Sequence, residues 1–457
     1  MKRILILLLL PLAFFSCKTG SKKSVVVSEE IKSAHPEWIM QGNIYEVNIR
    51  QYTPEGTFNA FAKHLDRLKE MGVQTLWFMP INPISKLERK GTMGSYYAVA
   101  DYTAINPEFG SLNDWKQLVQ AIHEKGMKVI IDWVPNHTGA DHRWITSHPE
   151  FFVKDSTGKP AVPFDWTDTR QLDFNNSAME DSMVASMKFW LSETGIDGYR
   201  VDVAWNVPAK FWNKCVPQLK ALNNNMFLLA EGDKSYLLTS GFDAYYPWEM
   251  FKMMIKVASG QRPAFALDSV KYKYDTAYPK DAIPMYFTSN HDENSWNKSD
   301  YGTFPGPVHA PFAVFSQTMS GTVPLIYSGQ EEPLLRKLEF FEKDPISFGK
   351  FERAKFYKTL LELRKKNIAL AADASFQKVT LGDDKAIYSY VREKNGNKIL
   401  VILNLSKKEQ SIKVTDKSLL ANANNIFMGT NETVTDKEWK LAPWGYVVYE
   451  YQTAGAN

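Results

Sequence analysis

The sequence predicts an α/β protein built on a (β/α)8 TIM barrel, with a small domain inserted after strand three and an antiparallel β-domain at the C-terminus. Apolar strand-like runs alternate with amphipathic segments from about residue 42 to about residue 370, as parallel βαβ units do. One connection, residues 137–176, is long and rich in turn residues, which indicates an insertion. After about residue 372 the runs become alternating or β-branched, a pattern typical of antiparallel strands.

Eight apolar runs supply the predicted barrel strands. They are residues 43–51, 73–79, 127–134, 196–203, 226–231, 242–248, 283–289 and 323–329. The segments between them repeat apolar residues at intervals of three and four, as helices do, and two of them, residues 57–72 and 112–126, stop at Gly72 and Gly126. Eight strands alternating with helices are what a closed barrel requires.

Composition excludes one class of partner and favours another. The chain has 457 residues and a net charge of +3, and no basic block interleaves with aromatic residues, so nucleic acid is not an expected ligand. Aromatic residues make up 13% of the chain, which suits flat ligands such as sugars, although most aromatic residues in any protein are core. The sequence does not indicate an oligomeric state.

The N-terminus has the architecture of an export signal. Residues 1–16 have a basic start, an apolar run and a small residue, Ser16, directly before Cys17. This pattern resembles a bacterial lipoprotein signal, which implies lipid attachment at Cys17 and anchoring in the cell envelope, on the periplasmic or surface face of the outer membrane. A plain secretory signal is the alternative. The second cysteine, Cys215, lies in a helix-like segment and is expected to be an inert buried thiol.

Four of the predicted strands end in polar clusters. These are the stretches IIDWVPNH (130–137), GYRVD (198–202), LLAEGD (228–233) and FTSNHDEN (287–294). The carboxyl ends of barrel strands meet on one face, where the chemistry of such barrels lies. Charged side chains at the ends of buried strands are costly unless they bind each other or a ligand. The four clusters therefore predict one site.

In this order and on these strands, the four stretches resemble the signature regions of the α-amylase family of glycoside hydrolases. The resemblance extends over about residues 40–370 and includes residues 94–111, the start of the inserted B domain and residues 340–346. It implies hydrolysis of α-1,4-glucosidic bonds in starch or maltooligosaccharides, with a covalent glycosyl-enzyme and retention of configuration. An exo-acting α-glucosidase, a transglycosylase of the same family and a non-catalytic sugar-binding lipoprotein are the alternatives.

The resemblance also implies roles for particular residues. Asp202 is the expected nucleophile, Glu231 the acid and base, Asp292 the third carboxylate that binds sugar hydroxyls, His137, His291 and Arg200 further binding residues, and Tyr97 an aromatic platform under the sugar. Arg200 lies two residues before Asp202, and its fixed charge is expected to keep that carboxylate ionised.

Several positions depart from the family pattern. Trp205 and Asn206 stand where the family usually has Lys-His, and Trp205 is expected to bind a leaving-group sugar by stacking. No cofactor is expected to be required. Asn136 matches a calcium-ligand asparagine of the family and is the only metal-ligand candidate, but Gln171 replaces the usual acidic ligand. Loss of a charged oxygen is expected to weaken calcium binding markedly.

The predicted organisation has six segments. They are a signal peptide (1–16), a tether (17–37), the first part of the barrel (38–136), the inserted B domain (137–176), the second part of the barrel (177–371) and a C-terminal β-sandwich domain (372–457).

Overall fold

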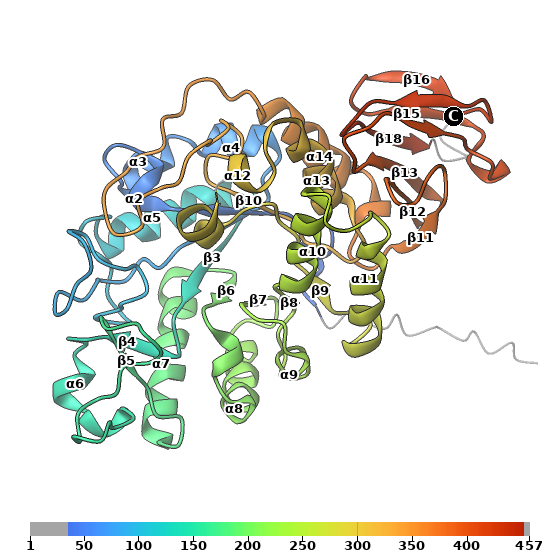
Figure 1. The fold of residues 1–457 in the computed structure, drawn as a ribbon. Coiled ribbons are helices and arrows are strands. Elements are labelled where there is room, and N and C mark those ends of the chain that lie inside the picture. Colours follow the sequence, from blue (N-terminus) through green and yellow to red (C-terminus); the bar gives the residue numbers. More distant parts are fainter. Residues whose placement is uncertain (1–34, 299, 452–457) are drawn as a thin grey trace, which may run out of the picture. The chain divides into compact units, whose positions relative to one another are not determined.

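The computed structural model describes residues 35–298 and 300–451 and contains the predicted barrel (Figure 1). Its strands are β1 (Ile44–Val47), β2 (Thr75–Phe78), β3 (Lys128–Trp133), β6 (Gly198–Val201), β7 (Phe227–Ala230), β8 (Ala244–Tyr245), β9 (Ile283–Pro284) and β10 (Leu325–Tyr327). Each lies within one of the eight predicted runs, and each is shorter than its run. The runs continue beyond the hydrogen-bonded strand residues into the loops at the carboxyl ends of the strands, where the polar clusters lie.

The eight strands form one parallel sheet in the order β10-β1-β2-β3-β6-β7-β8-β9. Backbone hydrogen bonds between the last strand segments close the ring: Val323 N–H donates to the carbonyl of Pro284 (3.2 Å), and Leu325 N–H to that of Tyr286 (3.0 Å). A Cβ atom at Gly198, whose φ is +150°, would lie 1.9 Å from a backbone oxygen of β7. Glycine there lets β6, which carries the predicted site residue Arg200, pack closely on β7.

Helices surround the strands and complete the βα units. They are α1 (Glu37–Met40), α2 (Ile49–Tyr52), α3 (Phe58–Ala62), α4 (Leu65–Met71), α5 (Leu112–Glu124), α6 (Trp144–Ser147), α7 (Ser177–Thr194), α8 (Ala209–Lys220), α9 (Ser235–Thr239), α10 (Trp248–Ala258), α11 (Ala266–Ala277), α12 (Asp300–Thr303), α13 (His309–Thr318) and α14 (Ala354–Lys366). The single helix expected over residues 57–72 is two, α3 and α4, because the chain turns at Lys63 and His64. Gly72, with φ +100°, ends α4 as predicted.

The long connection after β3 contains a small sheet of its own. Strands β4 (His137–Gly139) and β5 (Thr169–Gln171) pair antiparallel, with His137 opposite Gln171. An isolated bridge between Phe152 and Leu172 continues this pairing. The pairing places Gln171 beside the end of β3, where the first polar cluster lies.

The C-terminal part of the chain is an antiparallel β-domain. Its strands are β11 (Ser375–Val379), β12 (Ile387–Lys394), β13 (Asn397–Asn404), β14 (Gln410–Ile412), β15 (Asn422–Asn425), β16 (Thr430–Thr433), β17 (Trp439–Leu441) and β18 (Tyr446–Tyr451). Six of them form one sheet, and β14 pairs with β17 in a second, two-stranded sheet. Ile412 and Leu441 of the small sheet pack with Leu400 and Ile402 of the large one, so the domain has two layers.

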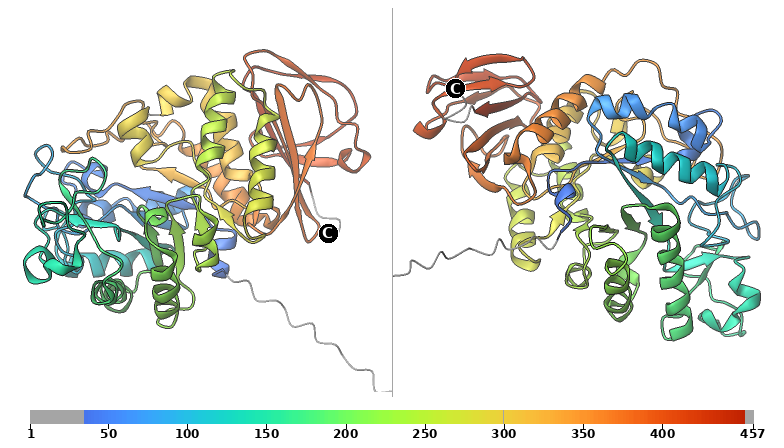
Figure 2. Two further views of the ribbon diagram at one scale, coloured as in Figure 1. Left: turned by 60° about the horizontal axis from the view of Figure 1, so that its bottom comes forward. Right: turned by 180° about the vertical axis from the view of Figure 1, so that it is seen from behind.

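Helix α13 lies against the C-terminal sheet (Figure 2). The fully buried Arg392 of β12 donates hydrogen bonds to the carbonyls of Thr318 (3.0 Å) and Met319 (2.6 Å) at the end of α13 and to that of Ala371 (2.8 Å). Burial lowers the pKa of Arg392 to about 10. A guanidinium bonded to carbonyls from two segments ties the barrel to the β-domain.

Cys17, the predicted signal peptide and all but the last three residues of the predicted tether lie outside the described residues. In the part of the chain that the structure describes, no helix combines the length and the apolar character needed to cross a membrane. Cys215 is fully buried in α8, and burial raises its pKa to about 12. The predicted burial of this thiol is therefore confirmed, and its raised pKa agrees with the expectation that it is inert.

Candidate active site

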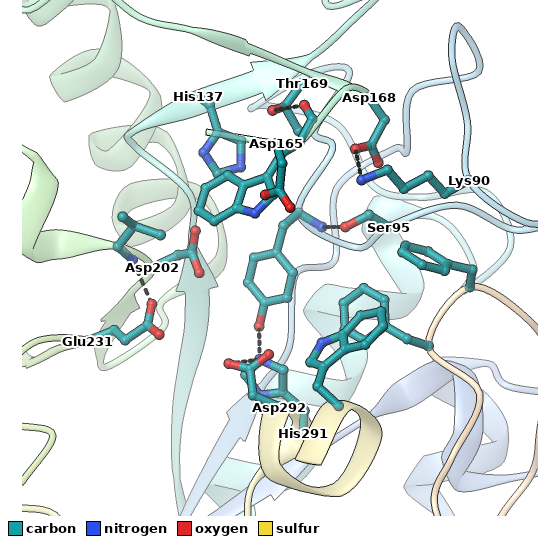
Figure 3. A pocket seen from close by; sticks show the side chains of 16 residues that line it. Lys90, Ser95, His137, Asp165, Asp168, Thr169, Asp202, Glu231, His291 and Asp292 are labelled. Carbon is teal, nitrogen blue, oxygen red and sulfur yellow. Dashed lines mark hydrogen bonds and ion pairs between the residues drawn. The ribbon is translucent and has the colours of Figure 1, made fainter. Parts of the chain in front are cut away.

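The predicted site residues gather around one cavity of about 540 Å³ at the carboxyl ends of the barrel strands. Its lining includes Tyr97, His137, Asp202, Glu231, His291 and Asp292, together with Lys90, Ser95, Asp165, Trp166, Asp168, Thr169, Val203, Trp296, Phe340 and Phe341. Figure 3 shows Asp202 and Glu231 beside each other on one wall and Asp292 with His291 on another. All three predicted carboxylates therefore share the cavity, although they come from loops after three different strands.

Arg200 connects the carboxylates from below the cavity. Its side chain is fully buried, and Nη1 donates to Asp132 Oδ1 (2.9 Å) and to Asp202 Oδ1 (3.1 Å). Nη2 lies 3.2 Å from Glu231 Oε2, an ion pair whose angles are not those of a hydrogen bond. The guanidinium also lies over the ring of Trp77, 5.0 Å from its centroid. One cation thus holds three acidic side chains together in a water-poor setting.

Burial controls the ionisation of the two aspartates that Arg200 contacts. Burial raises the pKa of Asp132 to about 6 against the opposing charge of Arg200. The pKa of Asp202 is raised well above its usual range, because burial and the neighbouring Glu231 outweigh Arg200. Arg200 thus acts in the expected direction, but the expectation that it keeps Asp202 ionised overlooked the larger opposing effects of burial and of Glu231.

A hydrogen bond from the backbone holds the carboxylate of Glu231 in position. Its Oε2 accepts a hydrogen bond from the N–H of Val203 (2.7 Å). Val203 has a φ of +45°, in the left-handed region that β-branched residues rarely adopt. This conformation directly after Asp202 turns the N–H of Val203 toward Glu231. The strained residue therefore ties the loop after β6 to the carboxylate after β7.

His291 is bound on both ring nitrogens. Nδ1 lies 2.5 Å from Oε1 of the fully buried Glu46, and Nε2 lies 2.8 Å from the Tyr97 hydroxyl and 3.4 Å from Asp292 Oδ2. Burial opposes a charge on the ring, but Asp292 and Glu46 outweigh it and raise the pKa of His291 to about 9. The Tyr97 hydroxyl in turn donates to Asp132 Oδ2 (3.0 Å). The ring is therefore an imidazolium that donates from both nitrogens.

His137, unlike His291, carries no charge. Burial lowers its pKa to about 3, so the ring is neutral at neutral pH. Nδ1 accepts a hydrogen bond from Asn136 Nδ2 (3.1 Å), which leaves the Nε2–H as the donor of the ring. The two histidines at the cavity thus differ in charge, and this difference follows from their neighbours alone.

Trp205 lies outside the cavity lining, on the short turn Ala204–Asn206 that follows Asp202, and 40% of its surface is exposed. The hydroxyl of Tyr236 donates to the Trp205 carbonyl (2.8 Å). A Cβ atom on Gly232 would lie 2.9 Å from that of Trp205. Phe164, 57% exposed and with φ +53°, has its ring 6.0 Å from Trp205 and 4.7 Å from Trp166. These three rings form an aromatic cluster beside the cavity.

Some residues of the site were not expected from the sequence. Glu46 could have been found, because a glutamate inside the apolar strand β1 signals a buried charge with a partner. Trp296, Phe340 and Phe341 form a second aromatic wall, with ring centroids 4.9 Å (Trp296–Phe340) and 5.5 Å (Trp296–Phe341) apart. Phe340 and Phe341 lie in the stretch 340–346 that resembles the family, but no role was expected for them, and Trp296 gave no signal because spacing does not distinguish it from a core residue.

The residues around Asn136 do not fit a calcium ion. Asn136 Oδ1, the oxygen that would face a metal, accepts hydrogen bonds from Asn206 Nδ2 (2.9 Å) and Gln171 Nε2 (3.2 Å). Gln171 also donates to the backbone carbonyl of Asn136 (3.0 Å). Calcium prefers several oxygen ligands that include carboxylates, whereas these three side chains are neutral amides that satisfy each other. Among the residues that the structure describes, no group of three or more His, Cys, Asp or Glu side chains could hold a metal ion.

Comparison with known proteins gives two family matches. Residues 33–170 match the family model described as "Alpha amylase, catalytic domain", and residues 387–448 match "Alpha-amylase SusG C-terminal domain". The chain is 24% identical to the α-amylase MalA of Haloarcula japonica over 397 residues, which cover 82% of this chain and 57% of that protein. It therefore spans less than two thirds of the length of this relative.

Two solved structures have the same fold over nearly their whole length. An α-amylase from Lactobacillus plantarum superposes with a TM-score of 0.82 at 27% identity, covering 91% of this chain and 100% of that one. A maltogenic α-amylase from Thermotoga neapolitana gives a TM-score of 0.83 at 26% identity, covering 90% and 99%. The comparisons agree with the fold described above over both the barrel and the C-terminal domain.

Proposed function

Because this chain belongs to the α-amylase family of glycoside hydrolases, we propose that it hydrolyses α-1,4-glucosidic bonds in starch or maltooligosaccharides with retention of configuration. The observation that carries the proposal is the contact of one guanidinium, that of Arg200, with both Asp202 and Glu231 at the cavity. Retaining hydrolysis needs two carboxyl groups about 5–5.5 Å apart. Two carboxylates that contact neighbouring nitrogens of one guanidinium can lie at this spacing.

The reaction proceeds in two steps with these residues. Asp202 attacks the anomeric carbon while Glu231 gives its proton to the departing glycosidic oxygen, and a covalent glycosyl-enzyme forms. Glu231 then takes a proton from water, whose oxygen attacks the same carbon and releases Asp202. The Val203 N–H holds Glu231 in place. Burial, and after it the neighbouring Glu231, raises the pKa of Asp202, while Arg200 opposes the shift and favours the anion that attacks the sugar.

The remaining residues stabilise the positive charge that develops on the sugar. The acidic side chains of Asp132, Asp202, Asp292 and Glu231 outnumber the two cations of this buried site, Arg200 and the His291 imidazolium. An excess of carboxylate oxygens in a low-dielectric cavity favours an oxocarbenium-like transition state. The neutral His137 can donate a hydrogen bond to a sugar hydroxyl without adding a positive charge.

Two groups of aromatic side chains support a sugar-chain substrate. Trp296, Phe340 and Phe341 lie at the cavity, and Trp205 lies at the turn that packs on Gly232, the residue after the proposed acid. Because Glu231 protonates the leaving oxygen, the Trp205 side is the leaving-group side. Aromatic faces on both sides of the carboxylates suit a chain of several sugar units, since each ring can stack on an apolar sugar face.

Proton NMR of the purified protein with maltoheptaose tests the proposal. The wild type is expected to release fresh α-anomer, and Asp202→Asn is expected to release none. Asp181→Asn, a change on the outer face of α7, is the matched control and should leave the rate unchanged. Fresh β-anomer, or full activity in Asp202→Asn, would refute the mechanism.

The same spectra separate the alternatives. Release of glucose or maltose alone from the start of the reaction would indicate an exo-acting enzyme. Products longer than maltoheptaose would indicate a transglycosylase. Binding without any product from the wild type would indicate a sugar-binding protein. Export and lipid attachment at Cys17 are part of the proposal, and mass spectrometry of the protein from its native membrane, with Cys17→Ser as the control, tests them.

A further inference from the structure

The C-terminal domain contains a second cavity of about 320 Å³. It lies where strands β15, β16 and β18 of the large sheet (Figure 1) meet β17 of the small sheet, and its polar or aromatic lining includes Asn425, Glu432, Thr433, Trp439 and Tyr449. All of these residues belong to the C-terminal domain, so this cavity is separate from the one that holds Asp202. Its volume is at the lower end of the range of about 300–1,000 Å³ for small-molecule sites.

The carboxylate of Glu432 is held in a fixed position. Oε1 accepts a hydrogen bond from the Thr430 hydroxyl (2.7 Å), and Oε2 accepts one from the Tyr449 hydroxyl (2.9 Å). Each carboxylate oxygen has two lone pairs, so both can accept a further hydrogen bond from a ligand. Glu432 is the charged residue among the described lining residues. An anionic ligand would therefore be repelled, and a ligand rich in hydroxyl donors is favoured.

Asn425 supplies the complementary group. The residue is 7% exposed, and its Oδ1 accepts a long hydrogen bond from the N–H of Met428 (3.4 Å). Among the residues that the structure describes, none accepts a hydrogen bond from Asn425 Nδ2, and this nitrogen is not among the fully buried polar atoms. It can therefore donate to water or to a ligand. This donor lines the cavity together with the acceptor Glu432.

Trp439 provides an apolar surface beside these polar groups. It is half-buried at the start of β17, where it packs on the apolar core of the domain and also lines the cavity. A stacking ring next to an oriented carboxylate and an amide is the combination that recognises a sugar, because a pyranose has an apolar face and a rim of hydroxyl groups that both donate and accept.

We propose that this cavity is a second carbohydrate-binding site, which holds one sugar unit of a neutral glycan away from the catalytic cavity. The identification of that glycan as α-glucan rests on the proposed function. The sugar stacks on Trp439, donates from its hydroxyls to Glu432 and accepts from Asn425 Nδ2. Such a site would keep the enzyme on a large or insoluble substrate while the catalytic cavity cuts a different part of it, since two linked sites raise the effective concentration of substrate.

Isothermal titration calorimetry of the full-length Asp202→Asn protein with maltoheptaose tests the site without hydrolysis. Two binding events are expected. Glu432→Gln and Tyr449→Phe keep the shape of the cavity, and with Trp439→Ala each should weaken one event at least about tenfold and leave the other intact. Met428→Ala, a change at a side chain that is 74% exposed and does not line the cavity, is the control and should change neither event.

Activity measurements in the wild-type background complete the test. The three cavity variants should hydrolyse soluble maltoheptaose at the wild-type rate and starch granules several-fold more slowly. A single binding event in Asp202→Asn, or two unchanged events in all three variants, would overturn the inference. The failure of the proposed function is a different result: the wild type would then release no product from maltoheptaose at all.

Discussion

The ion pair between His291 and Glu46 makes the stability of the barrel depend on pH. His291 is fully buried, and its Nδ1 lies 2.5 Å from Oε1 of Glu46, which belongs to β1, 245 residues earlier in the sequence. The pair joins the loop after β9 to β1, and the neighbouring Asp292 adds a second negative charge. Replacing His291 by glutamine removes the charge and keeps a polar side chain of similar reach.

The size of the effect follows from the pKa of His291, which is about 9 in the folded protein and 6.5 in an unfolded chain. One pKa unit corresponds to about 1.4 kcal/mol, so the pair contributes at most about 3 kcal/mol to the free energy of unfolding. Because the folded pKa is the higher one, the contribution is complete below about pH 6.5 and is lost as the pH rises through about 9. It is an upper bound, since burial also raises the pKa of Glu46, so this carboxylate is itself costly to ionise.

Urea unfolding at about pH 6, 7.5 and 9.5 measures the effect. The wild type should lose up to about 3 kcal/mol more than His291→Gln between the lowest and the highest pH. In Glu46→Gln the free energy of unfolding should also depend much less on pH, because this variant lacks one of the two carboxylates that raise the pKa of His291. His148→Gln, a change at an exposed histidine, should keep the pH dependence of the wild type. Parallel curves for the wild type and His291→Gln would refute the reasoning.

Three further predictions concern the positions that depart from the family pattern. Trp205→Ala should raise KM for maltoheptaose about fivefold, because stacking on a sugar is worth about 1 kcal/mol, while Trp205→Phe should retain most of the affinity; initial rates decide this. Gly232→Ala should lower kcat/KM about equally in the wild type and in the Trp205→Ala background, because a Cβ atom at residue 232, where φ is +147°, would lie 2.9 Å from the Cβ of residue 205, which alanine keeps; a double-mutant cycle of rates, expected to show little coupling, checks this. Treatment with a chelator should leave the melting temperature unchanged, because Gln171 and Asn206 already occupy the Asn136 oxygen; a drop of more than about 5 °C would contradict this.

The arrangement of strands and helices could be predicted because it depends on local patterns. Each of the eight barrel strands lies in a mostly apolar run, since a strand buried on both faces is largely apolar and carries a charge only where that charge has a partner. The residues at which helices and strands begin and end were harder to predict. The amphipathic pattern of residues 57–72 continues across Lys63 and His64, where the chain turns, so the break depends on packing that periodicity does not record.

The candidate site was predictable only in part, for a related reason. Asp202 and Glu231 follow β6 and β7 directly, and Asp292 lies in the loop after β9, so the chain next to them places them at the carboxyl ends of the barrel strands. Glu46 and Phe164 act on residues far away in the sequence, His291 and Trp205 respectively. Closure of the barrel and folding of the inserted domain bring these partners together, and such contacts produce no recognisable pattern of spacing in the sequence.

The departures from the family pattern belong to one structural unit rather than to separate sites. The turn Ala204–Asn206 carries Trp205, which packs on Gly232, and Asn206, whose amide donates to Asn136 Oδ1. The same three-residue turn therefore presents the aromatic ring on the proposed leaving-group side and supplies one of the two amide donors that occupy the Asn136 oxygen. A metal at Asn136 would require the Asn206 side chain to rotate away from that oxygen. We therefore expect the turn, which begins two residues after the proposed nucleophile, to influence both the binding of the leaving group and the binding of a metal.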